Sequence, residues 1–311
     1  MIEFIIKRLL IGTLTVWFIA TATFFAMHAV PGNPLMNDKA VAAEVRANLE
    51  KKYGLDKPLG EQYVIYLGNM LQGDFGISFT QQNRRVNDII KDHFPVSALL
   101  GVLALTFAAI GGILLGALTA HFRDRLPDIA IMLLVIVAIS VPSFVLAVFG
   151  QLIIVNVNRW LGFSLLPVAG WGDFSHMLMP ALVLGLGTMA YLTRLMRSSM
   201  LEVVHSDYIR TAHAKGLSTG RIFFSHQLRN AILPVITILG PAVAAITTGG
   251  FVVELVFSIP GLGRYFVQAV QQLDYTVIMG TTVFYGAFLV FMVIFIDILY
   301  GFIDPRIRVG K

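Results

Sequence analysis

The sequence contains no cysteine among its 311 residues, which excludes disulfide bonds, thiolate metal ligands and cysteine nucleophiles. It also carries little charge. Only 13% of its residues are Asp, Glu, Lys or Arg, whereas a soluble globular protein normally has about 25%. Hydrophobic residues make up 57% of the chain. This composition predicts a protein that is embedded in a lipid bilayer.

The sequence also lacks the motifs of common catalytic and nucleotide-binding sites. It has no GxxxxGK[ST] segment that would bind ATP as a P-loop, and neither HExxH nor GxSxG occurs. His205, His213 and His226 share one polar segment, but their spacings of eight and thirteen residues are not those of a metal site. We therefore predict that the chain is not an enzyme and holds neither a metal nor another cofactor of its own.

Ionisable residues are scarce inside the apolar runs, where Glu254, Asp297 and His28 occur. Ionisable residues inside a membrane are costly, and they commonly mark ion pathways or proton relays. A transporter driven by ions or protons would need several acidic residues on neighbouring helices. The scarcity argues against a stand-alone secondary transporter or channel.

Six apolar stretches are long enough to cross a membrane, which takes about 20 residues in a helix. The first follows Lys7 and Arg8, as a signal peptide would, but it is longer and bulkier than a typical signal core. We interpret it as a retained helix. The predicted fold is all-α and polytopic, with six transmembrane helices at about 9–30, 96–120, 129–154, 177–196, 232–253 and 277–303.

The distribution of Lys and Arg predicts the orientation of these helices. If the N-terminus is cytoplasmic, the inside segments hold thirteen Lys and Arg residues, whereas the two short outside loops hold only Arg159 and Arg264. The other eight lie in the long segment 31–95, and long loops carry little weight in the positive-inside rule. Both termini are therefore expected in the cytoplasm. Membrane topology explains the net charge of +5 better than nucleic-acid binding does.

The segment 31–95 is the one large external insertion. We expect a short helix at about 40–53 and a second amphipathic run at 61–72, followed by a turn in GDFG at 73–76. Regular apolar spacing favours a small cap over a solvated loop. The chain then divides into an N-terminal transmembrane helix, this extracytoplasmic insert and a core of five further transmembrane helices: residues 1–30, 31–95 and 96–311.

A polar, basic segment separates the fourth and fifth apolar runs. Over 198–231 its apolar residues recur at roughly helical spacing, and Gly216 divides it into two short amphipathic helices. Pro234 follows in the next apolar run, where a proline in the first turn costs a helix little. Two helices joined by a glycine on the wet side of a membrane form a shape that a soluble partner can grip.

Residues 247–263 are unusual for a transmembrane segment, because their glycines and Pro260 would end or bend a helix before it leaves the bilayer. Non-helical backbone at that depth is tolerated where it is buried in protein or lines a watery cavity. We expect the fifth helix to end early and the chain to fold back near the outer side. Gly112 and Gly116 form a GxxxG pattern, which we expect to pack helices within the chain rather than to form a dimer.

Four stretches taken together are similar to a known family: KKYGLDKPLGEQYVIYLGNMLQGDFGISF at 51–79, HSDYIRTAHAKGL…LRNAILPV at 205–235, FSIPGLGRYF at 257–266 and DPRIR at 304–308. On these residues the chain resembles, from end to end, the B-type membrane subunit of bacterial oligopeptide and dipeptide ABC importers. That subunit belongs to the binding-protein-dependent permease superfamily.

The superfamily's cytoplasmic loop reads EAA, three residues, Gly, nine residues, Ile-x-Leu-Pro. Here Arg210-Thr211-Ala212 replaces EAA, and Gly216 to Pro234 spans eighteen residues rather than thirteen. This departure resembles the peptide-importer branch.

The resemblance implies a type I ABC importer permease fold and a translocation subunit for peptides, with oligopeptides favoured. It implies as partners a second homologous permease subunit, two cytoplasmic ATPase subunits that bind ATP and Mg, an extracytoplasmic peptide-binding protein and membrane lipid, but no nucleic acid. The loop 198–231 then couples the chain to the ATPases. Residues expected in the ATPase groove are Asp207, Tyr208, Arg210, Thr211, Ala212, Lys215, Gly216 and Leu217.

The translocation path is expected against the third, fourth and fifth helices, with an outer gate at Glu254, Phe257, Pro260, Gly261 and Gly263. Import of a nickel complex or of another small solute stays open as an alternative substrate. Rival functions of other classes are a secondary transporter and an intramembrane enzyme. The enzyme would need a catalytic pair at matching depths, and none is visible.

Overall fold

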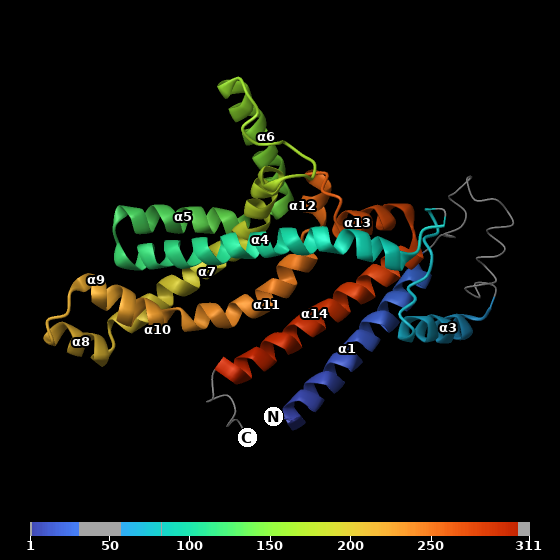
Figure 1. Ribbon diagram of the computed structural model, residues 1–311, viewed down its shortest axis with the longest axis horizontal. Helices are drawn as coiled ribbons and strands as arrows, with labels where there is room; N and C mark the ends of the chain where they lie inside the picture. The colour runs from blue at the N-terminus through green and yellow to red at the C-terminus, as the bar shows by residue number, and fades with distance from the viewer. Residues whose placement is uncertain (1, 31–56, 82, 304–311) are drawn as a thin grey trace. The chain divides into compact units, whose positions relative to one another are not determined.

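The computed structural model describes residues 2–30, 57–81 and 83–303, and the regular elements of these residues are helices, as predicted (Figure 1). The helix expected at 40–53 lies outside the described residues. The longer helices are α1 (Ile2–Ala29), α4 (Val86–His121), α6 (Ser143–Leu161), α7 (Phe174–Val204), α11 (Leu233–Gly249) and α14 (Tyr275–Ile303). Shorter ones are α3 (Leu59–Leu71), α5 (Leu126–Ser140), α8 (Asp207–Ala214), α12 (Phe251–Val256) and α13 (Leu262–Gln272). Between α8 and α11 lie α9 (Thr219–Arg221), the π-helix η1 (Ile222–Leu228) and α10 (Arg229–Ala231).

Five of the described helices, α1, α4, α6, α7 and α14, are long and apolar enough to cross a membrane. A sixth span results if two helical pieces that are bent by 45°, Thr219–Ala231 and Leu233–Val243, count as one. Large apolar side chains on these helices are exposed, among them Leu14 at 62% and Phe291 at 61%. Such surfaces suit contact with lipid, which agrees with the predicted polytopic fold.

The third predicted segment, 129–154, is not one continuous helix, and the prediction was wrong on this point. The chain forms α5 and α6, with a break at Val141 and Pro142. Val141 is extended, with φ −93° and ψ 126°, because a residue that precedes proline is sterically kept out of the helical region. Pro142 then caps the start of α6. The apolar composition masked this break, since apolar residues predominate on both sides of it.

Contacts divide the chain into two compact units, and the first contains the described residues up to Ser97 and from Pro260 onward. In this unit α1 packs along α14 (Figure 1). Gly12 allows the close approach, because a Cβ there would lie 2.7 Å from Val290 Cγ1. A buried cluster joins these helices to the neighbouring loop through Phe24, Phe79, Tyr275 and Met279.

The described part of the predicted insert belongs to the same unit. The amphipathic run expected at 61–72 is α3, and the expected turn has Gly73 and Gly76 at φ +74° and +92°. Tyr63 Oη lies 2.6 Å from Thr21 Oγ1 of α1. α3 therefore rests against the N-terminal helix instead of extending freely into solvent.

The second unit, residues 98–259, is built around α7. On one side α4 approaches closely, because a Cβ at Gly112 would lie 2.6 Å from Leu192 Cβ and one at Gly116 would lie 2.5 Å from Met196 Cβ. The GxxxG pattern thus packs helices within the chain, as predicted. Leu192 and Met196 also belong to a core with Ala117, Met200, Ala231 and Val235.

Candidate functional site

The helix α8 is short and amphipathic. Ile209 and Ala212 are 2% and 5% exposed and pack with Ile222, Val203 and Leu217. Positions three residues apart lie on the same face of a helix, so this apolar face attaches α8 to the rest of the loop. The two short helices predicted on either side of Gly216 are confirmed as α8 and the continuous α9–α10 piece.

Gly216 ends α8 in a Schellman motif. Its φ is +72°, its N–H donates to His213 O at 2.9 Å, and the Leu217 N–H donates to Ala212 O at 3.3 Å. This pair of hydrogen bonds satisfies carbonyl groups at the end of the helix, and the left-handed residue between them is normally glycine. The predicted role of Gly216 as the stop of α8 therefore has a specific backbone cause.

The opposite face of α8 is exposed and polar. Asp207, Tyr208, Arg210 and Thr211 lie on it, and Lys215 and Gly216, just past the end of α8, are exposed as well; these are six of the eight residues expected in a partner's groove. Arg210 and Asp207 form an ion pair of 3.7 Å with both side chains largely exposed, so it adds little stability. The other two expected residues differ, since Ala212 is buried and Leu217 is partly buried against α8.

The returning arm of the loop holds α8 from one side. Asn230 Nδ2 donates a hydrogen bond of 2.9 Å to Tyr208 Oη, and Ala231 is fully buried in the core around α7. Residues 222–228 of this arm form a π-helix, a rare geometry that is frequent at functional sites. Sequence reasoning missed it, because no residue pattern distinguishes a π-helical turn from an α-helical one.

The predicted early end of the fifth helix is confirmed in the second unit. α11 stops at Gly249, and α12 ends in a Schellman motif whose left-handed residue is Ser258, at φ +55°. The N–H of Ile259 donates to Glu254 O at 2.8 Å. Glu254 and Phe257 are 2% and 1% exposed. The Phe257 carbonyl accepts a hydrogen bond from Gly170 N–H, which ties this broken segment to the loop before α7.

Pro260, Gly261 and Gly263 lie at the start of the C-terminal part of the first unit. His93 Nδ1 is 2.8 Å from Pro260 O, and a carbonyl only accepts, so Nδ1 carries the hydrogen. The imidazole stacks on Tyr265 with ring centroids 4.1 Å apart. Gly261 precedes α13, and Gly263 is buried in its first turn. Sequence reasoning did not find His93, which lies 167 residues before Pro260.

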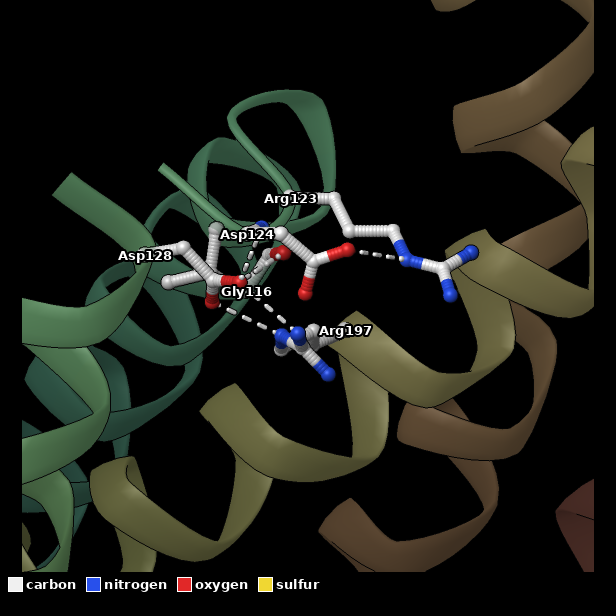
Figure 2. Close-up of polar contacts among 6 residues, drawn as sticks. Gly116, Arg123, Asp124, Asp128 and Arg197 are labelled. Carbon is white, nitrogen blue, oxygen red and sulfur yellow. Dashed lines mark hydrogen bonds and ion pairs between the residues drawn. The ribbon is translucent and has the colours of Figure 1, made fainter. Parts of the chain in front are cut away.

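A second group that sequence reasoning missed joins α5 to α7. Asp128 accepts from Arg197 Nε and from Arg197 Nη2, each at 2.8 Å, and from the Asp124 N–H at 3.0 Å (Figure 2). Asp128 is 3% exposed. Figure 2 shows this pair beside the turn that carries Arg123 and Asp124. The sequence showed only that acids and bases lie at the ends of two apolar runs, without anything to pair Asp128 with Arg197.

Asp173 and Tyr66, both outside the spanning helices, have shifted pKa values. Hydrogen bonds from Ser175 and His176 lower the pKa of Asp173 to about 2. Burial raises the pKa of Tyr66, whose hydroxyl has no hydrogen-bond partner among the described residues. Neither group lies on the exposed face of α8. In the part of the chain that the structure describes, no three His, Asp or Glu side chains are placed to hold a metal ion.

Comparison with known proteins decides the family. Residues 112–309 match the family of the binding-protein-dependent transport system inner membrane component, and residues 1–101 match the N-terminal region of such membrane components. The chain belongs to this family. It is therefore a multi-pass protein of the inner membrane.

Relatives of this permease match it over its whole length. It is 45% identical to the dipeptide transport system permease protein DppB of Bacillus subtilis, over 100% of this chain and 99% of the relative. It is 42% identical to the oligopeptide transport system permease protein OppB of Haemophilus influenzae and 38% identical to that of Escherichia coli. Each of these two alignments covers 99% of this chain and 100% of the relative.

Proposed function

We propose that this permease is the membrane-spanning subunit of an ATP-driven importer of peptides, with oligopeptides favoured over dipeptides. The observation that carries the proposal is its full-length similarity, at 38–45% identity, to permeases named for dipeptide and oligopeptide transport. The exposed, polar helix α8 supports it, because a permease that is driven by a separate motor needs a surface on which the motor acts.

The chain supplies the path, and other subunits supply the energy. It has no P-loop sequence, so ATP and Mg bind to two separate ATPase subunits in the cytoplasm. A second, homologous permease subunit completes the path, and an extracytoplasmic binding protein delivers the peptide. Both termini and the loop 198–231 face the cytoplasm, which the excess of Lys and Arg in these segments supports.

In this proposal α8 is the lever on which the ATPases act. The exposed residues Asp207, Tyr208, Arg210, Thr211, Lys215 and Gly216 contact the ATPase groove. Ala212 and Leu217 support the lever from its buried side, since both pack in the cluster beneath α8. Only a rigid element transmits a displacement, and α8 is fixed by this cluster, by the Schellman motif at Gly216 and by the Tyr208–Asn230 hydrogen bond.

The outer gate consists of the broken segment around Glu254 and Phe257 and of the turn with Pro260, Gly261 and Gly263. The tight packing of Glu254 and Phe257 within the second unit suits a gate that closes by protein contacts. The path itself runs against α5–α6, α7 and α11–α12, which are the helices of the third, fourth and fifth apolar runs.

Reconstitution in proteoliposomes tests the proposal. The permease with its sister subunit, both ATPases and the binding protein is expected to take up a labelled oligopeptide when ATP is present. The permease alone is expected to take up none. Uptake by the permease alone would overturn the proposal in favour of a secondary transporter. ATP-driven uptake of a nickel complex that peptides do not inhibit would correct the substrate.

A further inference from the structure

Three hydrogen bonds hold the Asp128 carboxylate in its ion pair with Arg197. Arg197 contacts the carboxylate through two nitrogens, and the Asp124 N–H supplies a third hydrogen bond (Figure 2). A bidentate guanidinium–carboxylate pair restricts both distance and angle. The side chains are 4% exposed for Asp128 and 25% exposed for Arg197, so water competes little for these hydrogen bonds.

Arg197 belongs to the part of α7 that leads directly into the coupling loop. α7 ends at Val204 and α8 begins at Asp207, so no flexible linker separates them. Val203 of α7 packs beneath α8, and Met196 and Met200 of α7 pack on Ala231 of the returning arm. A displacement of α8 therefore also moves the end of α7 that carries Arg197.

Asp128 lies at the start of α5, directly after the turn 122–125 that joins α4 to α5. Elsewhere α4 packs closely on α7 through small and apolar residues, such as Gly112 and Gly116 against Leu192 and Met196. Smooth apolar surfaces with small residues allow helices to slide or rotate against each other at low cost. The ion pair removes that freedom. A hydrogen bond tolerates only a small change of its donor–acceptor distance, so a shift between the helices would break the Asp128–Arg197 hydrogen bonds.

Stability alone is a weak reason for such a pair. Removing two charges from water offsets most of their mutual attraction, and replacing a buried ion pair by apolar residues of similar volume is often neutral. What apolar residues do not supply is a single relative position of the two helices. The pair is thus better explained by positioning than by stability.

We propose that the Asp128–Arg197 ion pair is the fixed link through which a displacement of α8 reaches the α4–α5 turn. The two are positioning residues for transport. They touch neither ATP nor peptide, and they make α7 and the α4–α5 turn move as one body. This inference rests on the proposed function, because it assumes that the ATPases displace α8.

Distances between spin labels test the link directly. The chain has no cysteine, so single cysteines at Arg123 and His213, both exposed, can be labelled in the assembled importer. With the link intact, the distance between these labels is expected to be a single narrow population, unchanged when ATP is added. The decisive variant is the double replacement Asp128→Leu with Arg197→Met, which removes both charges together and leaves neither charge unpaired.

The double variant is expected to insert and assemble, but to show a broadened label distance that changes with ATP. Its peptide uptake per ATP hydrolysed is expected to fall by about tenfold, within the usual range of coupling between sites. Arg194→Met is the matched control, because it removes the same charge from α7 one turn earlier without touching Asp128, and it is expected to keep the narrow distance. Arg197→Lys keeps the charge but loses the bidentate geometry, and an intermediate result is expected.

A double variant with the wild-type label distance and wild-type uptake per ATP would overturn the proposal. So would single variants that fail to assemble and a double variant that recovers both assembly and transport, because the pair would then serve stability alone. Failure of the proposed function looks different. The wild-type importer would then not take up peptide, while the label distance would still report whether the link is rigid.

Discussion

Asp274 accepts a hydrogen bond from the hydroxyl of Ser78, which lies 196 residues earlier in the chain. The N–H groups of Phe79 and Thr80 donate to the same carboxylate at 3.2 Å each. The Thr276 hydroxyl and the Val277 N–H, at the start of α14, donate to Oδ1 of this carboxylate. One buried acid thus ties the end of the described insert to the last long helix.

Replacing Asp274 by alanine is expected to lower the stability of the first unit by about 3 kcal/mol, because several buried donors lose their acceptor at once. Asp88→Asn is the control, since Asp88 is an exposed acid in the first turn of α4. Thermal unfolding of the purified protein in detergent measures the difference. Equal melting temperatures for the two variants would show that the Asp274 hydrogen bonds contribute nothing.

Gly185 of α7 is expected to tolerate no side chain. An added Cβ would collide with the backbone oxygen of Ala104 in α4, and backbone atoms cannot rotate away as a side chain can. Gly185→Ala should therefore destabilise the second unit by about 1–3 kcal/mol, as overpacking does. Gly187→Ala offers the control two residues later, because nothing lies within 4 Å of its Cβ position. Melting temperatures of the two variants in detergent check this, and the prediction fails if they are alike.

Substitutions of Gly216 are expected to impair the protein only through the backbone conformation, and not through a clash of the new side chain. The space around it is open, but its φ is +72°, a conformation that costs other residues about 1–2 kcal/mol. ATP-driven peptide uptake should be highest for Gly216→Asn, lower for Gly216→Ala and lowest for Gly216→Val, because asparagine adopts the left-handed conformation most readily and valine least. Membrane insertion should be unaffected.

Gly220→Ala is the control for this series. Gly220 lies in the helix α9, and its Cβ position is also open, so alanine should leave uptake unchanged. If Gly216→Val transported like the wild type, the Schellman motif would have no part in coupling.

Asp173 is expected to titrate below the range of an ordinary aspartate. Its pKa is about 2 in the folded chain instead of 3.8, because Ser175 and His176 donate to it. The hydrogen bonds therefore stabilise the folded turn above about pH 4, and this contribution is lost as the pH falls toward 2. The infrared carboxylate band that Asp173→Asn lacks should persist at pH 3. If this band were lost with a midpoint near pH 3.8, the result would contradict the hydrogen bonds from Ser175 and His176.

Much of the architecture could be predicted because its causes are local. Long apolar runs predicted the spanning helices, and Gly216 predicted the end of α8, since a left-handed turn there needs a glycine. The glycines and Pro260 in 247–263 predicted a broken helix for the same kind of reason. The six exposed residues in α8 and just past its end were expected from the resemblance to the peptide importers together with the amphipathic spacing.

The rest could not be predicted because it depends on residues far apart in the sequence. Asp128 and Arg197 are 69 residues apart, and His93 and Pro260 are 167 apart, so no local pattern pairs them. The residues at 222–228 would fit an α-helix equally well, so the sequence did not reveal the π-helix. The break at Val141 and Pro142 was different, because the proline was visible and the apolar composition was given too much weight.

That break has a mechanical consequence. Val141 N–H bonds back to Val137, and the first N–H groups of α6 bond to Pro142 O, so no hydrogen bond of either helix crosses the junction. The angle between α5 and α6 can therefore change without unwinding a turn of either one. α5 is anchored at Asp128, and α6 is anchored separately through Gln151, which donates to the carbonyls of Val168 and Val256. The backbone hydrogen bonds therefore leave the α5–α6 angle free to change, and it is the separate contacts of the two helices with their neighbours that set it.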